Sequence, residues 1–107
     1  MKVQYKIRRT NVADSNIHRI ILYIDENFGQ EVALKALNEL EKVISELASN
    51  PYIGVQPRYN VLRRQGYRVL TTKKNLIFYK IDDVKKDIII YAVLAQRQDY
   101  IRIIQGL

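Results

Sequence analysis

Two neighbouring stretches of β-branched and aromatic residues, Leu76–Ile81 and Ile88–Ala95, constrain the fold of this chain more than any other feature. A charged turn separates them, and this combination predicts a β-hairpin. Both faces of the first stretch are apolar, with Ile77 and Tyr79 on one side and Phe78 on the other. The hairpin is therefore either central in its sheet or leaves an apolar face open for a partner.

The N-terminal half predicts one strand followed by two helices. Lys2–Arg8 alternates apolar and polar side chains, as a half-buried strand does. Asn11 is placed to cap the first helix, which ends at Gly29, and a second amphipathic helix begins at Gln30 and ends near Ser49. Because almost nothing separates the helices, we expect an antiparallel helical hairpin. The buried stripe of the first helix is expected to consist of Ile17, Ile20, Ile21, Ile24 and Phe28.

The remaining segments connect the helices to the β-hairpin. Pro51–Asn60 contains two prolines and a glycine and predicts a loop, while Val61–Arg64 and Tyr67–Thr71 predict either a short bulged strand or a tight turn. The fold class is therefore α+β: an N-terminal strand, an antiparallel two-helix hairpin on one face, a three- to four-stranded antiparallel sheet and a short C-terminal segment. We expect residues 1–107 to form a single domain.

Composition excludes several classes of chemistry. There is no cysteine, so disulfides and thiol catalysis are excluded, and the one histidine, His18, is expected at the boundary of a helix face. A single histidine forms no metal site unless several carboxylates converge on it, so we expect neither a metal nor a cofactor. No apolar stretch approaches the ~20 residues of a membrane span, and the N-terminus lacks a signal pattern. A cytoplasmic location without membrane association is expected.

The positive charge is concentrated in the second half. Residues 1–50 balance seven basic against seven acidic side chains, whereas residues 51–107 carry eleven basic and four acidic ones, which accounts for the whole net charge of +7. Such a patch attracts nucleic acid or an acidic protein; the alternative is a basic surface that only maintains solubility. The candidate nucleic-acid or target-binding residues are Arg63, Arg64, Arg68, Lys73, Lys74 and Arg97.

The same basic residues permit one kind of catalysis. Cleaving RNA without a metal requires groups that move protons and cations that surround the phosphate. Arg68 and Arg97 can supply the cations, and Tyr100 or Lys74 can move a proton. Arg68, Arg97 and Tyr100 are therefore catalytic candidates only if the chain is a ribonuclease, since the same residues bind a polyanion without any chemistry.

The chain resembles the RelE/ParE family of toxins from bacterial type II toxin–antitoxin systems over nearly its whole length. The residues that carry the resemblance are Gly66–Arg68, Ile77–Ile81 and Tyr91–Tyr100. The last segment is similar to a valine-leucine-histidine-x-arginine-x-aspartate signature. Arg97 and Asp99 match that signature, and Ala95 stands where histidine is common.

The resemblance implies a toxin that arrests growth until a cognate antitoxin wraps it with an amphipathic segment, in a hetero-oligomer. ParE-like toxins inhibit DNA gyrase, whereas RelE-like toxins are ribosome-dependent mRNA endoribonucleases. Leu76 and Ile103 stand where RelE-like toxins carry an arginine and a tyrosine. Together with Ala95, these positions favour the gyrase inhibitor; the endoribonuclease is the alternative, and an inert family member that only binds its partner is a third.

Overall fold

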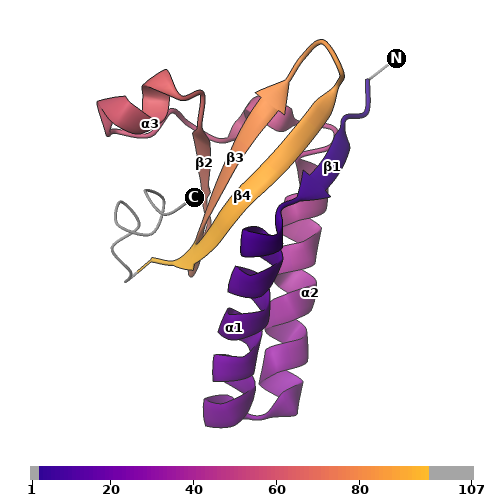
Figure 1. Cartoon of the computed structure of the whole chain (residues 1–107). Coiled ribbons are helices and arrows are strands. Elements are labelled where there is room, and N and C mark those ends of the chain that lie inside the picture. The colour runs from indigo at the N-terminus through magenta and orange to yellow at the C-terminus, as the bar shows by residue number, and fades with distance from the viewer. Residues whose placement is uncertain (1–2, 97–107) are drawn as a thin grey trace.

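The computed structural model describes residues 3–96, and Figure 1 shows the arrangement of its elements. The predicted order of a strand, two helices and a sheet is confirmed. No helix in the described part of the chain is both long and apolar enough to cross a membrane. The elements are β1 (Lys6–Arg9), α1 (Asn11–Phe28), α2 (Gln30–Glu46), the 3₁₀ turn η1 (Pro51–Ile53), α3 (Asn60–Arg64), β2 (Arg68–Thr71), β3 (Asn75–Asp82) and β4 (Asp87–Ala95).

The sheet is mixed, with the strand order β1-β4-β3-β2. The strands β2, β3 and β4 are antiparallel, as expected for the segment after the helices. β1 is the fourth strand and pairs in parallel with β4, placing Ile7 opposite Ile88. Parallel pairing needs a long connection, and here the two helices, β2 and β3 all lie between the paired strands in sequence.

The helices begin and end at recognisable signals. Thr10, rather than the expected Asn11, caps α1: its hydroxyl accepts a hydrogen bond from the Ala13 amide at 3.1 Å. Asn11 is already the first helical residue. At the other end Gly29 has φ 95°, a conformation that favours glycine, and donates its amide to the carbonyl of Asp25 at 3.0 Å. The prediction that Gly29 ends the helix is therefore confirmed.

The main core lies between the sheet and the helical hairpin. Ile77 and Tyr79 of β3 face the helices, and both side chains are fully buried. Phe78 faces the other way, so the predicted alternation of β3 is confirmed. The buried residues of this core are Ala13, Ile17, Leu40, Ile44, Leu47, Ile77, Tyr79, Ile88, Ile90 and Val93.

The second face of the sheet is also buried, by the chain's own residues. Val61–Arg64, expected as a strand or turn, lies in the short helix α3, whose Leu62 packs in a second cluster with Tyr67, Val69 and Phe78. The hairpin is thus central in its sheet. The alternative that it leaves an apolar face open for a partner is wrong for the described residues, because α3 and Tyr67 contribute side chains that fill this face.

The apolar stripe of α1 is buried only in part. Ile17 is buried and Ile20 and Ile24 are half-buried, but the Phe28 side chain is 64% exposed. In Figure 1 both helices extend past the end of the sheet. The outer turns of the hairpin therefore have no sheet to pack against, and the prediction of one continuous buried stripe is wrong.

Candidate functional site

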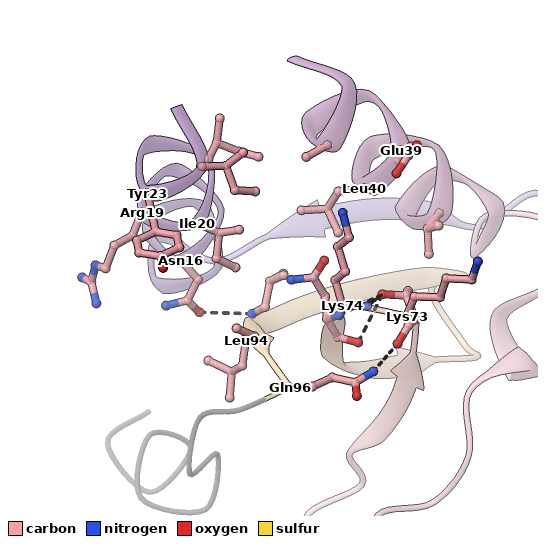
Figure 2. A pocket seen from close by; sticks show the side chains of 18 residues that line it. Asn16, Arg19, Ile20, Tyr23, Glu39, Leu40, Lys73, Lys74, Leu94 and Gln96 are labelled. Carbon is pink, nitrogen blue, oxygen red and sulfur yellow. Dashed lines mark hydrogen bonds between the residues drawn. The ribbon is translucent and has the colours of Figure 1, made fainter. Parts of the chain in front are cut away.

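A groove of about 950 Å³ lies between the helical hairpin and the end of the sheet (Figure 2). α1 and α2 form one wall, and the β2–β3 turn with the end of β4 forms the other. Its apolar side chains include Ile20, Ile24, Leu40, Val43 and Val93. A groove of this size with an apolar floor is large enough to take side chains of a peptide segment.

Hydrogen bonds hold the groove walls in place. The Asn16 side chain of α1 accepts from the backbone amide of Val93 in β4 at 3.1 Å, which ties the helix to the sheet. On the facing wall, the Thr72 hydroxyl accepts from the Asn75 amide at 2.9 Å. The Gln96 amide donates to the Lys74 carbonyl at 3.1 Å. These contacts close the β2–β3 turn, and its two lysines, Lys73 and Lys74, are exposed and line the groove.

The rim of the groove is positively charged. Lys73 and Lys74 lie at the turn and Arg19 lies on α1, all three exposed, with Glu39 of α2 as the acidic residue of the lining. None of the three cations pairs with a carboxylate among residues 3–96. An apolar floor with unpaired cations at its edge is complementary to an amphipathic segment that carries carboxylates.

Arg68 lies away from this groove. It is the first residue of β2, whereas Lys73 and Lys74 follow the other end of that strand. Its guanidinium donates to the carbonyl oxygens of Gly54 at 2.5 Å and Tyr52 at 3.3 Å, and lies 5.1 Å from the centre of the Tyr52 ring. Arg68 thus holds the loop around η1 against the sheet.

The remaining candidate residues occupy other positions. Arg63 and Arg64 are exposed at the end of α3, and Arg63 donates to the side chain of Asn60. Arg97 and Tyr100 lie outside the described residues. Of the candidates that are described, the structure brings only Lys73 and Lys74 to the groove, and it adds Arg19, which sequence reasoning did not single out.

Sequence reasoning missed the groove because it assigned Ile20 and Ile24 wholly to the core. One signal was available. The apolar stripe of α1 continues to Phe28 and is followed by Val32 in α2, so apolar positions reach the tip of the helical hairpin. A strand rises ~3.3 Å per residue and a helix ~1.5 Å, so β4 and α1 are about equally long. The sheet nevertheless covers only part of the helices, because it crosses them at an angle.

Comparison with known proteins identifies the fold and family. A sequence profile described as "ParE toxin of type II toxin-antitoxin system, parDE" matches residues 7–100. The chain belongs to the ParE toxin family. The resemblance inferred from the sequence motifs is thereby confirmed, and the chain is a ParE-family toxin of a type II toxin–antitoxin system.

Two solved structures share the fold of this ParE-family chain. The chromosomal ParDE toxin–antitoxin system from P. aeruginosa aligns with 20% identity over 86% of this chain and 96% of that chain, with a TM-score of 0.71. The toxin–antitoxin complex RelBE2 from Mycobacterium tuberculosis aligns with 18% identity over 90% of this chain and 95% of that chain, with a TM-score of 0.67. No curated protein matches the chain by sequence.

Proposed function

We propose that this ParE-family toxin arrests growth by inhibiting DNA gyrase, without chemistry of its own, and that a cognate antitoxin neutralises it by placing an amphipathic segment in the groove. The observation that carries the antitoxin part is the groove itself. Its floor is apolar, and its rim carries Lys73, Lys74 and Arg19 without carboxylate partners among residues 3–96. An acidic amphipathic segment can cover the apolar floor with its apolar side chains and pair its carboxylates with the cations of the rim.

The family assignment and the position of Arg68 support a binding toxin over a ribonuclease. A cation that clamps a phosphate must be free to approach it, but the Arg68 guanidinium is engaged by the carbonyls of Tyr52 and Gly54. The sequence has Ala95 in place of an imidazole at the end of β4, and its only histidine, His18, lies on α1. These features favour gyrase contact through exposed cations.

The proposed target surface comprises exposed basic side chains. Arg63, Arg64, Lys73 and Lys74 are exposed in the structure, and Arg97 lies outside the described residues. We propose that these residues contact gyrase, while Arg68 supports the loop behind them. Because long-range attraction from such cations is screened by salt, inhibition should weaken as ionic strength rises.

The test is a supercoiling assay with purified gyrase and the purified full-length chain. The proposal predicts loss of supercoiling, and a reduced effect for Arg97→Ala; Lys85→Ala, a change of an exposed lysine in the β3–β4 turn, is the matched control and should inhibit normally. Unchanged supercoiling at an excess of toxin would contradict the gyrase target. Mapping of transcript ends after induction examines the alternative: new cuts within translated messages would establish the endoribonuclease instead.

A further inference from the structure

The outer turns of the helical hairpin carry an apolar strip that continues from the groove floor to the tip. We define the hairpin strip as Ile20, Tyr23 and Ile24 of α1 together with Val32 and Ala36 of α2. These positions recur at the three- and four-residue spacings of one helix face. Tyr23 is 53% exposed and Val32 is 45% exposed. Among residues 3–96 the strip therefore lacks a covering element beyond the end of the sheet.

Charge changes sign along the hairpin strip. The tip, residues 20–38, contains Asp25, Glu26 and Glu31 against Lys35 as its one basic residue. The base, where the strip meets the sheet, carries Arg19 and the exposed turn lysines described above, against the single carboxylate of Glu39. The strip thus has an acidic end and a basic end on one continuous apolar surface.

We propose that two copies of this chain associate through their hairpin strips around a two-fold axis near Tyr23. Such an axis reverses the direction of the second strip, so the acidic tip of each copy meets the basic base of the other. The four helices then pack as an antiparallel bundle, which buries the apolar side chains of both strips. The interface is isologous and closes at two copies.

The spacing along α1 supports this register. Arg19 precedes Tyr23 by four residues and Glu26 follows it by three, which corresponds to about 6 Å and about 4.5 Å along the helix axis. In an antiparallel arrangement centred on Tyr23, Arg19 of one copy therefore lies close to Glu26 of the second copy. The pair occurs twice because of the symmetry, so each substitution acts at two places.

This inference does not depend on gyrase as the target. In the proposed dimer of the free toxin, the second copy partly covers the groove. Self-association and binding of an antitoxin segment therefore compete for the same apolar surface. The purified chain alone is therefore the right material for the test. The proposal of a dimer and the proposal of gyrase inhibition can each be contradicted without affecting the other.

Sedimentation velocity of the full-length chain, over a wide concentration range at low salt, tests the association. We expect a reversible monomer–dimer equilibrium. Tyr23→Glu should weaken the dimer by roughly tenfold or more, because it buries a charge at the axis. Leu22→Glu is the matched control: Leu22 is 45% exposed on the same helix but lies outside the strip, so this variant should dimerise normally. Circular dichroism verifies that both variants are folded.

A charge exchange tests the register. Arg19→Glu alone and Glu26→Arg alone should each weaken the dimer by about tenfold, and the chain that carries both changes should regain most of the original affinity. Lys42→Glu, at an exposed position of α2 outside the strip, is the charge-reversal control. A chain that stays monomeric, a dimer insensitive to Tyr23→Glu, a double variant without recovery, or species that grow beyond two copies would overturn the proposal.

Discussion

The hydroxyl of Tyr79 donates a hydrogen bond to the carbonyl oxygen of Pro51 at 2.7 Å and accepts one from the Gly54 amide at 3.0 Å. One fully buried side chain of β3 therefore holds both ends of the turn η1. Burial raises the pKa of this phenol, and the Gly54 amide and Arg68 partly oppose the rise. The loop that Arg68 contacts is thus anchored from inside the core.

Removing this hydroxyl should destabilise the protein. Tyr79→Phe leaves the Pro51 carbonyl and the Gly54 amide without their buried partner, and unsatisfied buried groups cost about 1–3 kcal/mol of the free energy of unfolding. Urea denaturation measures the change. Tyr23→Phe, which removes a hydroxyl from a half-exposed ring, is the control and should leave the midpoint unchanged. Equal midpoints for all three proteins would show that the anchor contributes nothing.

Gly54 should tolerate no side chain. A Cβ atom there would lie 2.5 Å from the Tyr79 hydroxyl oxygen and 2.9 Å from the Val69 carbonyl oxygen. Gly54→Ala is therefore expected to lower the free energy of unfolding by about 1–3 kcal/mol. Combining it with Tyr79→Phe removes one of the clashing atoms, so the cost of the alanine should be smaller in that background. Strict additivity in this double-mutant cycle would contradict the contact.

Arg68→Ala should act mainly on stability. The change removes hydrogen bonds to two loop carbonyls from a partly buried cation, and we expect a loss of about 1–2 kcal/mol in the free energy of unfolding. Arg64→Ala removes an exposed cation from α3 and should stay within about 0.5 kcal/mol. The measurement is urea denaturation alongside the supercoiling assay. If Arg68→Ala abolished toxicity while the stability stayed unchanged, Arg68 would instead contact the target.

Stability should fall in acid because of Asp83. Hydrogen bonds from the phenols of Tyr5, at 2.6 Å, and Tyr52 hold the pKa of this carboxyl below its usual range, with Lys86 contributing less. The unfolded chain takes up the proton at about pH 3.9, so this contribution is present above that pH and is lost as the pH falls through the folded pKa.

Asp83→Asn removes that titration. Its urea midpoint should depend less on pH between about pH 6 and about pH 3 than the midpoint of the unchanged protein. Asp25→Asn, at the exposed tip of the hairpin, is the matched control and should retain the original dependence. Parallel curves for Asp83→Asn and the unchanged protein would show that the tyrosine contacts do not affect stability.

The groove should select an acidic segment. A Lys73→Glu and Lys74→Glu double variant should bind the cognate antitoxin roughly tenfold more weakly, with a smaller dependence on salt, because the rim then repels carboxylates. Titration calorimetry at two salt concentrations measures both effects. Lys85→Glu, in the β3–β4 turn, should bind normally. Unchanged affinity of the double variant would place the antitoxin elsewhere.

Local patterns were enough to predict much of the fold. The alternation of Ile77, Phe78 and Tyr79 gave the two faces of β3, and Gly29 gave the end of α1. The short segment 61–64 was misassigned because four residues carry no clear period. Its helical form depends on Leu62 packing against Phe78, which is distant in sequence. The candidate site was anticipated only at Lys73 and Lys74.

The amino-acid sequence alone determined the order of elements, the apolar faces of each strand and the location of the positive charge, because side-chain periodicity and charge are local properties. Only the tertiary structure decided which elements cover each face of the sheet and which cations lack a carboxylate partner among residues 3–96. Asn16 meets Val93 and Arg68 meets Gly54 through contacts between separate segments of the chain. Such contacts depend on how the elements pack: the sheet crosses the helices at an angle, and the groove lies where the helical hairpin extends past the end of the sheet.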